Sequence, residues 1–321
     1  MAVIQYEGSS FETAGQTLLE AADQAQLRIP NSCRQGLCHS CLLVTEAVVP
    51  DESQQGLSDH QRAQGLFLAC QCRPNADMSV SLPGALGKVP ATLIAKRRLS
   101  DSVVELSFES SLRWTPGQYV TLWKDEQHGR AYSSASSRKY DGLLKLHVKR
   151  HEQGLVSRWC CDELLEEQTV LLGEASGHCF YTEGAHDKPL LLVGTGTGLA
   201  PLYAIVQEAL HQEHQQPIHL YAAAGEPQGL YLQDKLQALA EQHPMFHYHP
   251  VVRRLAEPGQ LQGDVASLVM AEHSALRGWA VYLCGAPLMI ESLRKRCFLA
   301  GASGSDILTD AFEVGRPGST V

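Results

Sequence analysis

Four cysteines near the start of the chain have the spacing of an iron–sulfur ligand set. Cys33, Cys38 and Cys41 form the pattern Cys-x4-Cys-x2-Cys, and Cys70 follows from a distant segment. This spacing is typical of the thiolates that hold a plant-type [2Fe–2S] cluster, a group that accepts and releases one electron at a time. The sequence therefore predicts a metal site for single-electron transfer with these four thiolates as ligands.

Two alternatives stay open for these cysteines. Cys72 competes with Cys70 for the fourth ligand position. If residues 67–72 are extended, these two side chains point to opposite faces, and we expect Cys70 to be the ligand. A structural zinc site is the other alternative, but zinc usually takes pairs of the form Cys-x2-Cys, and only Cys38 and Cys41 form one here.

A glycine-containing turn farther along the chain has the composition of a phosphate-binding turn. An apolar strand pattern at 189–194 runs directly into this turn, and a helical pattern follows it at 199–210. A turn of this kind lets a pyrophosphate approach backbone N–H groups at the start of the helix, although some such turns carry glycine only for close packing. The residues predicted to bind a dinucleotide here are Gly194, Thr195, Gly196, Thr197 and Gly198.

Three successive sequence patterns position these groups, because 321 residues are too many for one ordinary core. Residues 1–88 combine short strand patterns with one helical pattern at 17–25. Residues 89–185 are mostly short strands between Gly, Pro and Ser turns, which is typical of an antiparallel barrel. Residues 186–321 alternate strands with helices, which predicts a parallel α/β sheet. The break between the first two domains is expected at 83–87, where Pro and Gly interrupt both periodicities.

The composition limits the classes of partner. The formal net charge is −9, whereas phosphate backbones favour a basic surface, so nucleic acid is not expected as a partner. No apolar run approaches the roughly 20 residues that span a bilayer, and the first residues lack a basic start followed by an apolar signal segment. We expect a soluble, cytoplasmic monomer without a membrane partner.

A fourth motif, Arg130-Ala-Tyr-Ser133, follows the strand pattern at 119–123. Together with the cysteine motif, the glycine turn and the order of the three patterns, it resembles the ferredoxin–NADP reductase superfamily, in its oxygenase-reductase type with an N-terminal plant-type [2Fe–2S] domain. The resemblance covers essentially the whole chain. It implies a multidomain α+β and α/β protein, with a β-grasp ferredoxin domain, an FAD-binding antiparallel β-barrel and a Rossmann-like parallel α/β nicotinamide domain.

The resemblance also implies roles for residues near the reacting groups. Arg130 is expected to pair with a flavin phosphate, a role that suits the fork of a guanidinium. Tyr132 is expected to lie along the isoalloxazine and ribityl chain, and Ser133 to hydrogen-bond near flavin N5. Cys284 and Gly285 match the family's Cys-Gly-x-Pro motif, whose cysteine lies near the nicotinamide ring. The other reading of Cys284 is a small buried residue at a strand end.

Five further residues are implied by the resemblance at the edges of the flavin site. His147, Lys149, Gly154 and Ser157 match segments that hold the rest of the FAD dinucleotide. Ser157 is expected to cap a helix that faces the pyrophosphate. Phe312 matches the family's last strand and is expected to border the flavin.

The chain departs from the family pattern at two places. His39 follows the second cysteine, where glycine is common. In the segment 173–180, which the family usually writes Gly-Pro-x-Gly-x-Phe, only Gly173, Gly177 and Phe180 match. The consequence of either departure stays open at this point.

These predictions combine into one mechanism. NADH gives up two electrons together, a [2Fe–2S] cluster accepts one, and a flavin between them can divide the pair. The sequence thus predicts an NADH-dependent reductase that passes electrons through FAD and the cluster to a separate redox acceptor protein, an oxygenase component. A reductase for a deoxysugar dehydratase and a redox-sensing binding protein are the alternatives.

The choice between NADH and NADPH depends on the loop after the strand pattern at 218–224. This loop contains Glu226 and no basic residue, and a carboxylate repels a 2′-phosphate and accepts a hydrogen bond from a ribose hydroxyl. We therefore expect NADH. Arg253 and Arg254, in a neighbouring loop, keep NADPH open.

Overall fold

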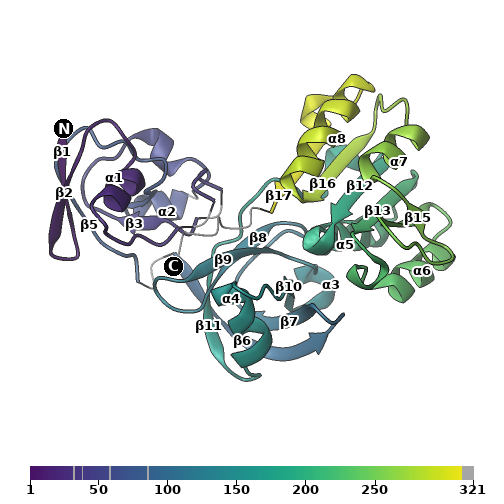
Figure 1. Ribbon diagram of the computed structural model, residues 1–321, viewed down its shortest axis with the longest axis horizontal. Helices are drawn as coiled ribbons and strands as arrows, with labels where there is room; N and C mark the ends of the chain where they lie inside the picture. Colours follow the sequence, from purple (N-terminus) through teal and green to yellow (C-terminus); the bar gives the residue numbers. More distant parts are fainter. Residues whose placement is uncertain (32, 38, 58, 85–86, 313–321) are drawn as a thin grey trace.

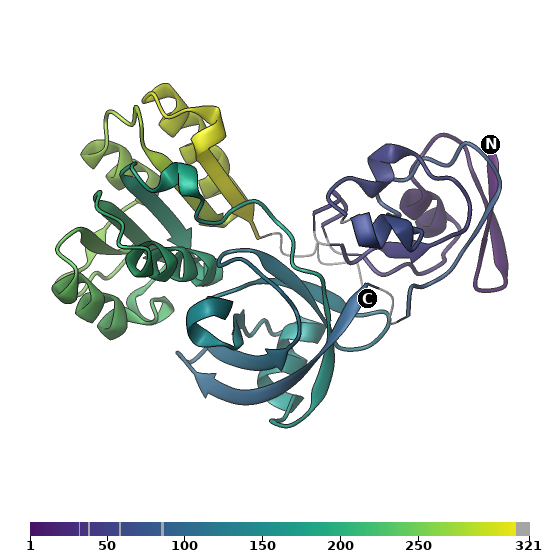
Figure 2. The ribbon, with the colours of Figure 1, turned by 180° about the vertical axis from the view of Figure 1, so that it is seen from behind.

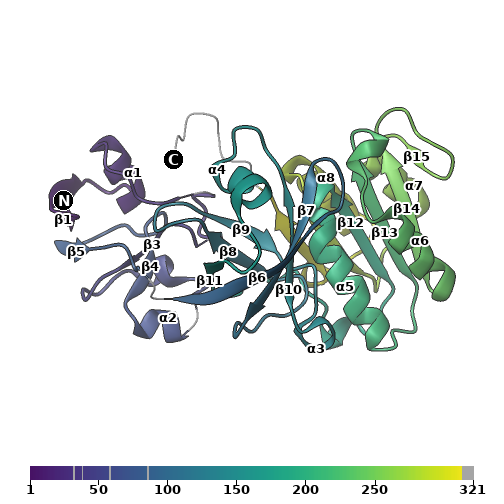
Figure 3. The same ribbon diagram turned by 90° about the horizontal axis from the view of Figure 1, so that it is seen from below.

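The chain forms three parts that lie in a row, with a β-barrel in the middle (Figures 1 and 2). Seen from below, the N-terminal part and the C-terminal sheet lie at opposite ends of this row (Figure 3). The computed structural model describes residues 1–31, 33–37, 39–57, 59–84 and 87–312.

The N-terminal part has a three-stranded mixed sheet, a separate two-stranded antiparallel sheet and a helix, α1, that is buried on one face. Strand β1 pairs antiparallel with β2 and parallel with β5, and β3 pairs with β4. The helix α1 begins at a capping box, in which the Thr17 hydroxyl accepts from the Glu20 N–H and the Glu20 carboxylate accepts from the Thr17 N–H. The elements are β1 (Ala2–Tyr6), β2 (Ser9–Thr13), α1 (Leu18–Gln24), β3 (Leu42–Val44), α2 (Asp59–Ala63), β4 (Leu66–Leu68) and β5 (Met78–Val80).

The middle part is an antiparallel barrel with the strand order β10-β7-β6-β11-β8-β9. A bridge between Ser134 and Leu146 joins the two ends of this order, so that the sheet closes on itself. Its interior is filled by apolar side chains such as Leu106, Phe108 and Leu122. The elements are β6 (Lys88–Arg98), β7 (Val103–Ser110), β8 (Tyr119–Trp123), β9 (Gly129–Ser133), α3 (Arg138–Asp141), β10 (Leu144–Lys149), α4 (Leu155–Arg158) and β11 (Thr169–Gly173).

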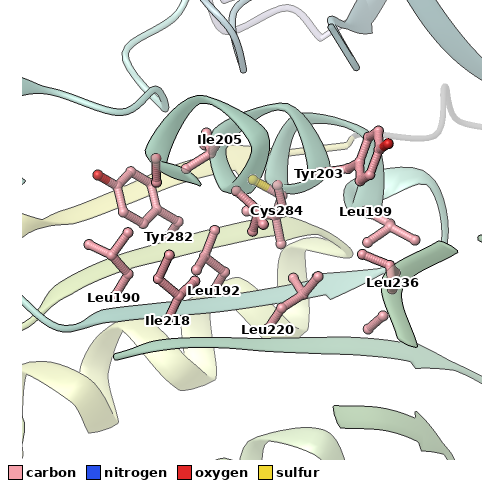
Figure 4. Close-up of a cluster of buried hydrophobic side chains, with 14 of the residues drawn as sticks. Leu190, Leu192, Leu199, Tyr203, Ile205, Ile218, Leu220, Leu236, Tyr282 and Cys284 are labelled. Atoms are coloured by element: carbon pink, nitrogen blue, oxygen red, sulfur yellow. The ribbon is translucent and has the colours of Figure 1, made fainter. Parts of the chain in front are cut away.

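The C-terminal part is a parallel sheet with the order β15-β14-β13-β12-β16-β17. Helices cover both faces, so its central strands are mostly apolar. Figure 4 shows the cluster on the face covered by α5, where Leu192, Leu220 and Tyr282 pack beneath Ile205. The elements are β12 (Leu190–Thr195), α5 (Leu199–His211), β13 (Ile218–Ala224), α6 (Gln233–Gln242), β14 (Phe246–Val252), β15 (Leu261–Gln262), α7 (Val265–Glu272), β16 (Ala280–Gly285), α8 (Pro287–Leu299) and β17 (Ile307–Ala311).

The predicted fold class is confirmed, with one local correction. The segment 67–72 is not extended, because β4 ends at Leu68 and the chain then turns, with the Cys72 N–H donating to the Leu68 carbonyl at 3.0 Å. The predicted break at 83–87 includes residues 85–86, which lie outside the described residues. Within the described part of the chain, no helix has both the length and the apolar character needed to cross a membrane.

Candidate functional site

The fold brings two of the predicted iron ligands into contact. The Sγ atoms of Cys41 and Cys70 lie 3.3 Å apart, and both residues are buried. Cys33 is partly exposed, and its Sγ accepts a hydrogen bond from the Gln35 N–H at 3.4 Å. Cys38 lies outside the described residues. Without it, the described residues form no group of three or more Cys, His, Asp or Glu side chains arranged to hold a metal ion.

The electrostatics at the candidate fourth ligand separate Cys70 from Cys72. A hydrogen bond from the Cys41 thiol, with a smaller one from the Gln71 amide, lowers the pKa of Cys70 to about 7. Burial instead raises the pKa of Cys72 to about 12, and a contact with Ser53 offsets this only in part. Because iron binds the thiolate, the donor set near Cys70 fits a cluster and Cys72 remains a neutral buried thiol.

The hairpin β8–β9 carries the flavin motif. Arg130 is partly exposed, and its guanidinium donates to the Gly129 carbonyl at 2.8 Å, which leaves the group accessible to a phosphate. Tyr132 packs against the apolar core of the barrel. Ser133, at the end of β9, lies opposite Tyr119 in the β8–β9 ladder. These positions fit the charged and the planar parts of a flavin nucleotide.

Ser133 reaches across to the C-terminal sheet. Its hydroxyl donates to the Asp310 carboxylate at 2.6 Å, although the two residues are 177 positions apart. Burial raises the pKa of Asp310 to about 6, and the hydrogen bond from Ser133 opposes this rise. Asp310 was not predicted as a site residue. Only Phe312, two residues later in the chain, was assigned to the flavin site. The available signal was a carboxylate near the end of the last strand pattern.

Cys284 lies at the end of β16, where it pairs with Asp310 of β17. It is fully buried, and its Sγ is 3.5 Å from that of Cys179 (Figure 4 shows Cys284 within the apolar cluster). Burial raises the pKa of the Cys284 thiol well above its ordinary value. The side chain is therefore neutral and apolar in character. The Phe312 N–H donates to the carbonyl of the adjacent Gly285 at 2.8 Å.

The predicted glycine turn joins β12 to α5 and packs against the end of β16. A Cβ on Gly198 would lie 2.3 Å from the Cys284 carbonyl oxygen, and one on Gly285 would lie 2.4 Å from Thr195 Oγ1. Close packing therefore requires these two glycines. Gly196 differs, because it has φ +55° and open space where a Cβ would stand. Strand β12 contributes Gly194 and Thr195 to the predicted set, and a 3₁₀ turn contributes Gly196, Thr197 and Gly198.

The two residues predicted on β10, His147 and Lys149, differ in their exposure to solvent. His147 is buried, with Nδ1 3.1 Å from the Tyr231 hydroxyl and Nε2 3.3 Å from Glu105. Lys149 ends β10 and is exposed. Both ring nitrogens of His147 thus face protein groups, and its assignment to FAD stays a prediction.

Ser157 does not cap a helix, contrary to the expectation. It is the third residue of α4, whose N-cap position is Gly154. The Ser157 hydroxyl accepts from the His151 N–H at 3.2 Å and donates to the Gly154 carbonyl at 3.3 Å. Ser157 therefore fixes the turn before the helix, and a Cβ at Gly154 would lie 2.4 Å from Ser157 Oγ and so displace this hydroxyl.

Comparisons with known protein families divide the chain into three consecutive matches. Residues 4–75 match the 2Fe-2S iron-sulfur cluster binding domain, 90–181 the oxidoreductase FAD-binding domain, and 192–295 the oxidoreductase NAD-binding domain. The predicted [2Fe–2S] cluster, FAD and nicotinamide cofactor are thereby confirmed, and the zinc alternative is set aside.

Full-length relatives agree with this order. The chain is 33% identical to an aromatic O-demethylase reductase subunit of Amycolatopsis, over 87% of this chain and 88% of that one. It is 31% identical to the reductase component of a naphthalene 1,2-dioxygenase system of Pseudomonas putida, over 94% and 95% of the two chains. The crystal structure of an Amycolatopsis cytochrome P450 reductase superposes with a TM-score of 0.70 at 29% identity, covering 97% of this chain and 99% of that one. The chain therefore belongs to the ferredoxin–NADP reductase superfamily, among the iron–sulfur flavoprotein reductases that carry an N-terminal [2Fe–2S] domain.

Proposed function

We propose that this chain supplies electrons from NADH, through FAD and a [2Fe–2S] cluster, to an oxygenase component. One observation carries the proposal. In the β8–β9 hairpin, Ser133 bonds Asp310 of the C-terminal sheet, and its ladder partner Tyr119 donates from its hydroxyl to the Leu37 carbonyl in the cysteine loop. A single strand pair with the flavin motif thus contacts the last strand of the C-terminal sheet, β17, and a loop within the segment that matches the cluster-binding family.

The printed names of the relatives support the class of acceptor. They belong to dioxygenase and demethylase systems, in which they are called reductase or electron transfer components. We propose the domain limits 1–88, 89–185 and 186–321, which agree with the start of β6 at Lys88 and of β12 at Leu190. A monomer in the cytoplasm remains a prediction.

The residues of the flavin site have separable proposed roles. Bound FAD accepts two electrons from NADH and releases them singly. We assign the flavin phosphate to Arg130, the face of the ring system to Tyr132, and the neighbourhood of N5 to Ser133. Asp310 orients the Ser133 hydroxyl by accepting its hydrogen bond, and it holds a proton itself below about pH 6. Cys284 supplies a neutral, buried thiol that excludes water from the contact between the barrel and the C-terminal sheet.

NADH is the proposed electron donor. Glu226 lies in the loop after β13, where its carboxylate accepts from the Gln228 side chain at 2.6 Å. The backbone N–H groups of Arg253 and Arg254 donate to the carbonyls of residues 224 and 225, so both arginines lie beside this loop. A higher kcat/KM for NADPH than for NADH would show that the arginines, and not Glu226, determine the selectivity.

Steady-state and content measurements on the purified protein test the function. We expect FAD and a two-iron cluster in equal amounts, rapid NADH oxidation with ferricyanide, and rapid NADH oxidation with cytochrome c. An oxygenase component purified from the same host should then turn over with NADH only when this chain is added. Slow turnover with both artificial acceptors would favour the redox-sensing alternative. Coupling to a dehydratase and not to an oxygenase would correct the acceptor.

A further inference from the structure

The two places where the sequence departs from the family pattern contact each other. His39 follows the predicted ligand Cys38, and Ser176 lies in the segment 173–180. The Ser176 Oγ is 3.3 Å from His39 Nδ1, across 137 positions of sequence and between the N-terminal part and the barrel. The His39 side chain is buried, with 6% of the residue exposed. The ring thus occupies the junction and not the solvent.

The backbone at His39 favours a different residue. Its φ is +53°, in the left-handed region where glycine is at ease and most side chains are not. A glycine here would hold the same loop with less strain. Since the histidine costs stability within its own loop, what it contributes lies in the contacts of its ring.

The barrel presents a built surface to this ring. Ser176 and Tyr119 pair through two backbone hydrogen bonds, at 2.8 and 2.9 Å, and Tyr119 is also the ladder partner of Ser133. The Tyr119 ring lies edge-on to His39, with centroids 6.5 Å apart, and packs over Gly177, which has φ +100° and whose Cβ would lie 2.8 Å from the ring. Tyr119, which pairs with Ser133 of the flavin motif, therefore also contacts the cysteine loop.

The contacts flank the cluster ligand on both sides. The Tyr119 hydroxyl donates to the carbonyl of Leu37, and Ser176 meets His39, so residues 37 and 39 are both held by the barrel. Two domains joined by a Pro- and Gly-containing segment move relative to each other unless their interface is large and hydrophobic. The contacts here are polar and specific, so they define one docked arrangement without preventing movement out of it.

We propose that His39 and Ser176, together with Tyr119 and Leu37, form a docking contact that positions the cluster loop for electron transfer from the flavin. His39 and Ser176 are positioning residues in this proposal, since they act through the distance between the two redox groups. The inference rests on the proposed order of electron transfer, NADH to FAD to cluster. It goes beyond that order by naming the residues that determine the rate of electron transfer from the flavin to the cluster.

The test follows the two steps separately in the holoprotein, by anaerobic rapid mixing with NADH. In His39→Gly and in Ser176→Ala we expect flavin reduction at the wild-type rate and a transfer from flavin to cluster that is slower by about tenfold, since small displacements of reacting groups have effects of this size. The double variant should be no slower than either single variant, because both remove one contact. Ser176→Thr, which keeps the hydroxyl, should restore the wild-type rate. His178→Ala changes an exposed neighbour and serves as the matched control.

A second measurement does not depend on activity. Hydrogen exchange of the barrel segment 174–179 should become faster in His39→Gly, although the substitution is in the other domain. The iron content and the melting temperature of the N-terminal domain should not fall in this variant, because glycine adopts φ +53° without strain.

Wild-type transfer rates in both single variants, or effects that multiply in the double variant, would overturn the docking contact. If His39→Gly loses iron, Ser176→Ala alone decides the question, because it is remote from the ligands in sequence. A wild-type protein that reduces its flavin but never its cluster would instead overturn the proposed function.

Discussion

The barrel meets its two neighbours through junctions of different character. Toward the C-terminal sheet, the junction is buried: Ser133 bonds Asp310, His147 bonds Tyr231, and Val103 of β7 belongs to the apolar cluster of that sheet. This junction combines apolar burial with one buried hydrogen bond, between His147 and Tyr231, and one partly buried hydrogen bond, from Ser133 to Asp310. It is expected to hold the two domains in one arrangement.

Toward the N-terminal part, the contacts seen among the described residues are polar. They include those of Leu37 and His39 with Tyr119 and Ser176. Contacts of this kind form and break more readily than a shared core. The difference matches the chemistry of the two steps, since transfer from nicotinamide to flavin needs direct contact, whereas the cluster must serve both the flavin and an external protein. The following predictions test this comparison, from the largest expected effect to the smallest.

Replacing Cys70, the proposed fourth iron ligand, should abolish electron transfer through the cluster and leave reduction of the flavin by NADH intact. In Cys70→Ser we expect loss of the cluster and a fall of cytochrome c reduction to the level of cluster-free protein, whereas ferricyanide reduction persists. The reason is that the Cys70 thiol lies beside that of Cys41 in the N-terminal part, whereas hydride transfer needs only the flavin and nicotinamide sites. Iron content, the visible spectrum and both activities provide the measurement.

Cys72→Ser is the matched control for that prediction. Cys72 is fully buried, and burial raises its pKa, so iron content and both activities should stay near the wild-type values. Loss of iron in this variant with retention in Cys70→Ser would reverse the ligand assignment. Loss of ferricyanide reduction in folded, FAD-loaded Cys70→Ser would contradict the separation of the two junctions.

The buried junction is expected to show a trade between activity and stability at Asp310. Its folded pKa of about 6 lies above the unfolded value of 3.8, so the folded protein binds more protons between these values and loses stability as the pH rises through them. Asp310→Asn cannot ionise and should therefore melt at an equal or higher temperature at pH 7. Flavin reduction by NADH should be slower by about tenfold, the size expected for a hydrogen bond to a charged group. A lower melting temperature at pH 7 together with an unchanged rate would contradict both parts.

Acid should weaken the C-terminal sheet through a cluster of histidines that is separate from the junction contacts named above. His219 and His249, on neighbouring strands, lie with Nδ1 and Nε2 3.2 Å apart, and His247 and His273 lie close to His219. Burial, and then the neighbouring imidazoles, lower the pKa of His219 to about 3 and that of His249 to about 4, while Glu272 opposes the shift at His249. The unfolded chain therefore takes up these protons first, and stability present above about pH 6.5 is lost as the pH falls.

Thermal melts between pH 7.5 and 5 measure this loss. We expect the melting temperature of the C-terminal domain to fall by several degrees on acidification, and by less in His249→Gln. The same acid shift in wild type and variant would show that other groups dominate.

The smallest effect is expected at an exposed ion pair of the cysteine loop. Arg34 and Asp23 lie 2.6 Å apart, but their side chains are 44% and 39% exposed. Asp23→Asn should change the free energy of unfolding by less than about 1 kcal/mol, since water screens such pairs. Flavin-to-cluster transfer should stay unchanged, and a large decrease would show that the polar junction extends beyond the four docking residues.

Local pattern determined much of this protein. The cysteine spacing, the Arg130 motif and the glycine turn identify three cofactors because each motif, apart from the distant Cys70, gathers its groups within a few residues. The helix predicted at 199–210 is observed as Leu199–His211, since the signals that place it after the glycine turn are local. The fold class followed from the change of periodicity between the three parts.

Only the tertiary structure decided which distant groups meet. Asp310 and Ser133 are 177 positions apart, and His39 and Ser176 are 137 apart, so no spacing rule links them. The turn after Leu68 also escaped the pattern, because a short apolar stretch is compatible with both strand and turn until its backbone hydrogen bonds are formed. A sequence motif reflects contacts between residues close together in the chain. The contacts of Ser133 and His39 depend instead on how the folded domains pack against one another.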